Sequence, residues 1–135
     1  MLPFQIQTYN GSQEPAANRI YILTKGNNSG KPRRTPYRNS LALTFKSEAE
    51  ADRGFYAIKS LFLAQVFKRQ LIGSVIPFIR LTDVIMIFKV YIHLFENDFP
   101  HYEQIAAATV YKDKLKKQYE SAIRLIQAIA ISIIH

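Results

Sequence analysis

The 135-residue sequence contains no cysteine. This absence excludes disulfides, thiol nucleophiles, iron–sulfur ligation and cysteine-type zinc sites. A chain without cysteine suits a reducing compartment. Residues 1–7 have neither the basic region nor the long apolar run of a secretory signal peptide. We therefore expect a cytoplasmic protein.

Long apolar runs are also missing. Residues 122–134 are interrupted by Arg124 and Gln127, and they fall short of the roughly 20 apolar residues that a bilayer span requires. No membrane span is expected. Hydrophobic residues make up 48% of the chain and charged residues 21%, as in folded globular proteins. A chain of this length buries a core without disulfides or metals, so we expect one domain over residues 1–135.

Acidic residues are scarce in the first third of the chain. The net charge is +8, and residues 15–47 contain seven bases and no acid. Residues 48–135 are nearly balanced, with eleven bases against nine acids. Segregated positive charge creates a field that attracts anionic partners.

The chain is expected to adopt an α+β fold, with a small antiparallel sheet packed on a helix and a long C-terminal helix. Residues 1–18 contain prolines and a glycine, which predict an irregular lead-in with a short edge strand at residues 4–9. Residues 19–99 form the predicted α+β core. Within it, β-branched and aromatic residues at 19–24 and alternation at 39–45 predict two strands joined by a long basic connection.

A helix is expected to begin after Ser47. Ser47 and Glu50 have the spacing of a capping box, in which the hydroxyl and the carboxylate each accept a backbone hydrogen bond. Mostly apolar residues follow at helical intervals, and Gly73 is expected to end the helix.

The segment after this helix is harder to interpret. Residues 75–79 contain Pro77, which restricts them to an edge strand or an extended segment. Residues 84–95 are rich in β-branched and aromatic side chains. A helix capped by Thr82 or Asp83 and a buried strand both remain alternatives there.

Residues 100–135 are expected to form the long C-terminal helix, because neither glycine nor proline follows Pro100. Its apolar side chains recur at alternating spacings of four and three, which is a heptad seam typical of a coiled coil. The seam consists of Leu115, Tyr119, Ala122, Ile126, Ile129 and Ile133. We expect it to bind a protein partner or a second copy of the chain, or else to pack back on residues 55–62.

Two motifs that suggest chemistry have simpler explanations. Residues 26–31 resemble a phosphate-binding loop, but three residues rather than four separate the glycines, and Pro32 replaces the magnesium-binding Ser or Thr. Four potential metal ligands lie further on: His93, Glu96, Asp98 and His101. Their spacing matches no known metal signature. We therefore expect a glycine turn, no metal, no cofactor and no enzymatic activity.

The remaining functional signal is the basic loop within residues 25–46. Its candidate nucleic-acid-binding residues are Lys25, Asn27, Asn28, Lys31, Arg33, Arg34, Tyr37 and Arg38. Lysine and arginine bind phosphates, asparagine reads base edges and tyrosine stacks on bases. A solvated loop that only confers solubility is the alternative. A third interpretation is an acidic membrane surface bound by the C-terminal helix, which carries lysines beside its apolar stripe.

Several short stretches match a known family. They are Phe55-Tyr56, Lys59-Ser60, Phe67, Leu71, residues 73–79 and Asp83. Through them, residues 55–84 resemble part of the target recognition domain of type I restriction specificity subunits, which read DNA. Residues 100–105 are similar to that family's entry into its long coiled-coil helix, and residues 25–45 are similar to its glycine-containing hairpin. The resemblance implies DNA binding by one half of such a subunit.

The whole chain also resembles short proteins of Bacteroidetes mobile elements, through residues 29–32 and 73–80. That resemblance implies no assigned activity. Taken with the basic loop, the sequence favours a non-enzymatic accessory protein that binds nucleic acid. The alternative is a protein-interaction module that acts through the C-terminal helix.

Overall fold

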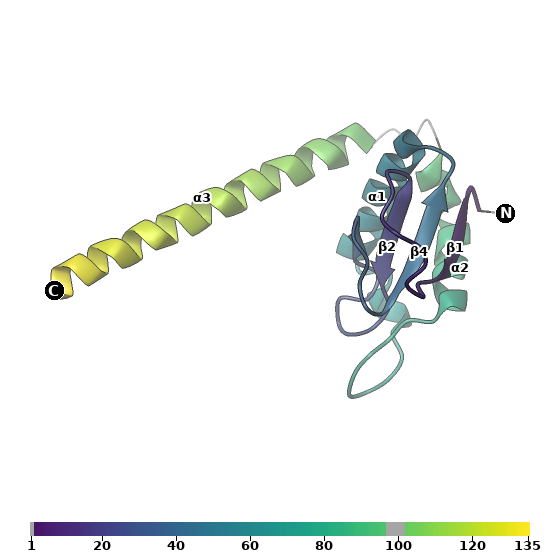
Figure 1. Cartoon of the computed structure of the whole chain (residues 1–135), viewed down its shortest axis with the longest axis horizontal. Helices are drawn as coiled ribbons and strands as arrows, with labels where there is room; N and C mark the ends of the chain where they lie inside the picture. The colour runs from purple at the N-terminus through teal and green to yellow at the C-terminus, as the bar shows by residue number, and fades with distance from the viewer. Residues whose placement is uncertain (1, 97–101) are drawn as a thin grey trace. The chain divides into compact units, whose positions relative to one another are not determined.

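The structure, a computed structural model, describes residues 2–96 and 102–135. The chain divides into two compact units, Met1–Tyr102 and Glu103–His135. The first contains a four-stranded sheet and its covering helices, and the second lies within a single helix, α3 (Tyr102–Ile134) (Figure 1). The predicted α+β fold and the long C-terminal helix are both confirmed.

The sheet is antiparallel throughout, with the strand order β1-β4-β2-β3. Its strands are β1 (Phe4–Thr8), β2 (Arg19–Leu23), β3 (Pro32–Arg33) and β4 (Ser40–Phe45). The expected pair of strands with a long connection is β2 and β4, and the lead-in supplies the edge strand β1 as expected. Strand β3 was not expected. Its Pro32 has no backbone N–H to donate, and it begins an edge strand, where that loss is tolerated.

The two faces of the sheet are covered differently. Alternate residues such as Ile20 and Ile22 of β2 join the main hydrophobic core, on the face that α1 and α2 cover in Figure 1. Tyr21 points the other way and is also fully buried. Its hydroxyl donates to the carbonyl of Gln13 in the irregular lead-in, and its ring meets the ring of Tyr9 edge-on. The pKa of Tyr21 lies above its usual value, because burial raises it by more than the nearby Arg19 lowers it.

Helix α1 (Glu48–Leu63) begins where the capping pattern predicts. The Ser47 hydroxyl accepts a hydrogen bond from the Glu50 backbone N–H at 3.2 Å. The expected end at Gly73 is wrong, because the helix stops at Leu63. Gln65 adopts a left-handed φ of 63°, which reverses the chain. Phe67 can then enter the core, where it is 1% exposed.

The segment from Lys68 to Phe95 contains short helices rather than a buried strand. They are η1 (Lys68–Gln70), α2 (Leu81–Val90) and η2 (Ile92–Phe95). Of the two alternatives for residues 84–95, a helix and a buried strand, the structure shows helix. The expected cap at Thr82 or Asp83 is wrong, since Arg80 holds the N-cap position without a side-chain hydrogen bond. Asp83 lies in the first turn instead and accepts from the Arg80 guanidinium at 3.0 Å.

Candidate nucleic-acid interface

The turn between β2 and β3 has exposed polar and basic side chains, and it is attached to the protein through buried residues. We call residues 25–31 the basic turn. Lys25, Asn27, Asn28 and Lys31 are exposed. Gly30 is buried, and its N–H donates to the Leu23 carbonyl at 2.7 Å. The turn leads into strand β3 rather than into a helix, as expected for a glycine turn and unlike a nucleotide-binding phosphate loop.

A second protrusion lies beside the basic turn. We call residues 72–78 the finger, a hairpin closed by two hydrogen bonds of 2.8 Å between the backbones of Ile72 and Phe78. The Gly26 N–H donates to the Pro77 carbonyl at 2.6 Å, and the Ile79 N–H donates to the Thr24 carbonyl at 2.9 Å. In Figure 1 the finger is the teal loop at the lower end of the first unit, next to the turn between β2 and β3. Residues about fifty positions apart thereby form one end of the unit.

A pocket joins the basic turn to the end of α1. It has a volume of about 230 Å³. Its lining residues are Asn27, Asn28, Ser29, Phe62, Leu63, Gln65 and Lys68. Lys68 is exposed, as is the adjacent Arg69 of η1. The fold therefore adds cations and a side-chain amide to the predicted loop.

The sequence contains a signal for Gln65, Lys68 and Arg69, which were not predicted as site residues. Residues 53–82 contain five bases and no acid, a second acid-free stretch hidden inside the nearly balanced remainder of the chain. Its bases are Arg53, Lys59, Lys68, Arg69 and Arg80.

Arg38 belongs to the same end of the sheet. It is exposed, and it lines a shallow pocket of about 210 Å³ together with Thr24 and Ile79. The neighbouring Asn39 accepts a hydrogen bond from the Thr24 backbone N–H at 3.1 Å. We define the basic end as the following exposed side chains: Lys25, Asn27, Asn28, Lys31, Arg38, Lys68 and Arg69.

Arg33 and Tyr37 form a separate stack along the β3 edge. The Arg33 guanidinium lies 4.2 Å from the centre of the Tyr37 ring. It also donates to the Thr35 hydroxyl at 2.8 Å and to the Pro36 carbonyl at 3.0 Å. The pKa of Tyr37 lies above its usual value, because burial raises it by more than the positive charge of Arg33 lowers it. Arg33 thus covers one face of the Tyr37 ring, so that face is not free to stack on a nucleobase.

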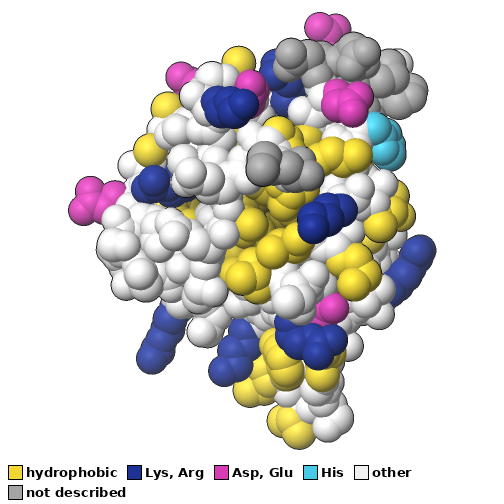
Figure 2. Space-filling model, turned by 90° about the vertical axis from the view of Figure 1, so that its right-hand side faces the viewer, with side chains coloured by type: hydrophobic (Ala, Val, Ile, Leu, Met, Phe, Trp, Pro, Cys, Tyr) yellow, Lys and Arg dark blue, Asp and Glu magenta, His cyan; other side chains and the backbone are white. Residues whose placement is uncertain are grey.

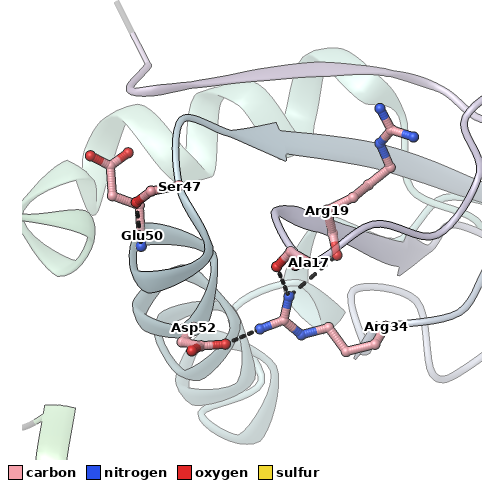
Figure 3. A network of polar contacts seen from close by, with 6 residues as sticks. All are labelled: Ala17, Arg19, Arg34, Ser47, Glu50 and Asp52. Atoms are coloured by element: carbon pink, nitrogen blue, oxygen red, sulfur yellow. Dashed lines mark hydrogen bonds and ion pairs between the residues drawn. The ribbon is translucent and has the colours of Figure 1, made fainter.

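Arg34 is held by the protein itself, as Figure 3 shows. It forms an ion pair with Asp52 of α1, and it donates to the Ala17 carbonyl at 3.1 Å. Its guanidinium also lies 5.6 Å from the centre of the Phe55 ring. These contacts tie the connection after β3 to α1, so we assign Arg34 a positioning role and leave it out of the basic end.

The potential metal ligands are only partly placed. His93 and Glu96 are exposed at and just after η2, whereas Asp98 and His101 lie outside the described residues. Within residues 2–96 and 102–135, no three His, Cys, Asp or Glu side chains gather in a way that would hold a metal ion. Over the same residues, no helix has the length and apolarity needed to cross a membrane.

Helix α3 contains every residue of the predicted seam. It runs for 33 residues without a break, so spacings of three and four place the seam residues on one face. A single helix has no core of its own, and the seam must be covered by something outside the helix if it is to leave water.

The model of a family described as "Family of unknown function (DUF6943)" matches residues 6–135. No curated protein matches the sequence. Among solved structures, the chain is similar to the crystal structure of a type-I restriction-modification system S subunit from M. genitalium, with 17% identity and a TM-score of 0.48. The match covers 86% of this chain and 29% of that chain.

Proposed function

The chain belongs to the DUF6943 family, whose function is unknown, and we propose that it binds nucleic acid through the basic end without catalysing a reaction. The proposal rests on one observation. The basic turn, Arg38 and the Lys68–Arg69 pair come from separate parts of the sequence, and the fold brings them to one end of the sheet.

The chemistry of this end suits a polyanion that carries bases. The ammonium group of lysine and the guanidinium group of arginine neutralise phosphates. Asn27, Asn28 and Gln65 are among the residues that line the pocket at this end, and a side-chain amide offers both donors and acceptors to a base edge. Phosphates would therefore set the affinity, and the amides would contribute any base preference.

The absence of enzymatic activity is part of the proposal. Residues 15–47 and 53–82, which supply the basic end, contain no Asp, Glu, His or Cys. These four residue types provide most general acids, general bases and metal ligands in proteins. A surface built from these segments is better equipped to hold phosphates than to transfer protons.

A titration of the full chain with labelled duplex DNA, single-stranded DNA and RNA tests the proposal. Fluorescence anisotropy at two salt concentrations gives the salt dependence. If the five cations of the basic end each neutralise one duplex phosphate, the logarithm of the affinity should fall by about 4.5 per log unit of salt. Failure of all three ligands to bind at low salt would refute a nucleic-acid-binding function.

A second candidate function belongs to α3, which forms its own unit. The family match extends through this helix to residue 135, so the helix is part of what the family shares. We infer that its seam binds a second copy of the chain or a protein partner. Burying one isoleucine side chain is favourable by about 1.5–3 kcal/mol, and the seam contains three isoleucines.

Lysine substitutions separate association from folding. Ile126→Lys with Ile129→Lys should convert an associated protein into a folded monomer in sedimentation, because both changes put a charge in the seam. Ile131→Lys with Ile134→Lys makes the same chemical change off the seam and should leave association intact. A wild-type chain that is monomeric at high concentration would exclude self-association. Loss of cooperative unfolding in the seam variant would instead indicate that α3 packs within its own chain.

A further inference from the structure

We propose that the finger is an apolar wedge that inserts between neighbouring bases of duplex DNA held at the basic end. The inference rests on the proposed function and adds to it a mechanical effect on the DNA. Its starting point is the tip of the finger, where hydrophobic side chains face water.

The tip contains the large hydrophobic side chain with the highest exposure among the described residues. Val75 is 90% exposed and Ile76 is 56% exposed, and Phe78 at the base of the hairpin is 40% exposed. Figure 2 shows hydrophobic side chains gathered on the lower protrusion, with Lys and Arg side chains around its base. Leaving these groups in water has a free-energy cost that an insertion site would recover.

The finger is anchored at its base. Its two ends are paired through Ile72 and Phe78, and its Pro77 carbonyl is bonded to Gly26 of the basic turn. Gly73 has a φ of 98°, and a Cβ there would lie only 3.0 Å from the Ile76 carbonyl oxygen. The base of the finger is thus fixed to the basic turn before any ligand arrives, which lowers the entropy lost on binding.

The neighbouring charges favour DNA as the occupant. Lys25 forms a backbone bridge with Phe78 at the base of the finger, and Lys68 and Arg69 precede it in η1. In a duplex, the bases are flanked by phosphates on both strands. Proteins that unstack a base step combine the same two elements, aliphatic side chains that enter the step and cations that hold the backbone.

An anionic membrane would also accept an apolar tip with a basic rim. The amide-bearing residues of the neighbouring pocket argue against it. Asn27, Asn28 and Gln65 line the pocket next to the basic turn, where they can hydrogen-bond to base edges, whereas acyl chains offer them no partner. We therefore assign the finger to DNA and treat lipid as an outcome of the test.

The test uses short duplexes with 2-aminopurine placed in flexible thymine–adenine steps, where unstacking is easiest. Its fluorescence rises when a base loses its stacking partner, and end-to-end energy transfer reports bending of the same duplex. The full wild-type chain should raise both signals on binding. Val75→Ser with Ile76→Ser should abolish the fluorescence rise and weaken binding about tenfold, but the salt dependence should persist because the cations remain.

Met86→Ser with Val90→Ser is the matched control, since both residues are exposed apolar side chains of α2. This variant should behave like the wild type. A wild-type chain that binds DNA without any rise in fluorescence would overturn the wedge while leaving the proposed function standing, and so would an unchanged rise in the Val75/Ile76 variant. No binding at low salt would overturn both. The wedge would also be overturned if the chain bound phosphatidylserine vesicles through Val75 and Ile76 and did not unstack DNA. The finger would then be a membrane contact.

Discussion

Charge reversal of Lys25 and Lys31 to glutamate is expected to weaken duplex binding about 10- to 100-fold at low salt. Both side chains are exposed on the basic turn, so each substitution replaces an attraction to phosphate with a repulsion. The loss should be similar for all DNA sequences, because phosphate contacts carry no base information. Anisotropy titrations on two unrelated duplexes measure both effects.

The same variant should also bind with a weaker dependence on salt. Two lost phosphate contacts would reduce the slope of log affinity against log salt by about 1.8. The melting temperature should hardly change, because exposed charges away from special contacts affect stability by only about 0.5 kcal/mol. Loss of folding in this variant would show that the lysines are structural.

A matched control distinguishes a local site from the net charge. Lys46→Glu with Lys89→Glu makes an equal change in charge at two other exposed lysines. Lys46 follows Phe45 and Lys89 follows Phe88, and both of these rings contact Phe4 at the far end of the sheet from the basic turn. The control should keep most of the affinity. An equal loss in both variants would contradict a site at the basic end.

Local signals explain what the sequence predicted well. The strand at residues 19–23 and the cap at Ser47 depend on side chains within a few positions of each other, and α3 depends on an uninterrupted helical pattern. Such features depend on neighbouring residues and not on contacts between distant segments. For the same reason the lysines of the basic turn could be proposed as candidates from their segment alone, and the structure shows that they are exposed.

Tertiary contacts decided the rest. The Arg34–Asp52 pair joins residues 18 positions apart. No local sequence pattern shows that this arginine forms an ion pair within the protein. Helix α1 ends early because Gln65 takes a left-handed conformation, although apolar spacing continues beyond it. That reversal also brings Lys68 to the pocket beside the basic turn. The unpredicted part of the candidate site and the wrong helix boundary therefore have one cause.

Gly30→Ala is expected to destabilise the first unit by about 2–5 kcal/mol, the sum of two penalties. Gly30 has a φ of 96°, where an L-residue is strained. An added Cβ would also overlap the ring of Phe67, which is fully buried in the core. Because Gly30 closes the basic turn on the core, the substitution should lower DNA affinity as well as the melting temperature. Denaturant unfolding and anisotropy measure the two effects.

Gly26→Ala separates the two penalties. Gly26 has nearly the same φ, 93°, but a Cβ there would meet nothing within 4 Å. This variant should therefore lose only the backbone term, about 1–2 kcal/mol. Combining Gly30→Ala with Phe67→Leu should cost less than the sum of the single changes, because the smaller side chain makes room for the methyl group. Equal destabilisation by the two alanines, or strict additivity of the pair, would show that Phe67 does not support the basic turn.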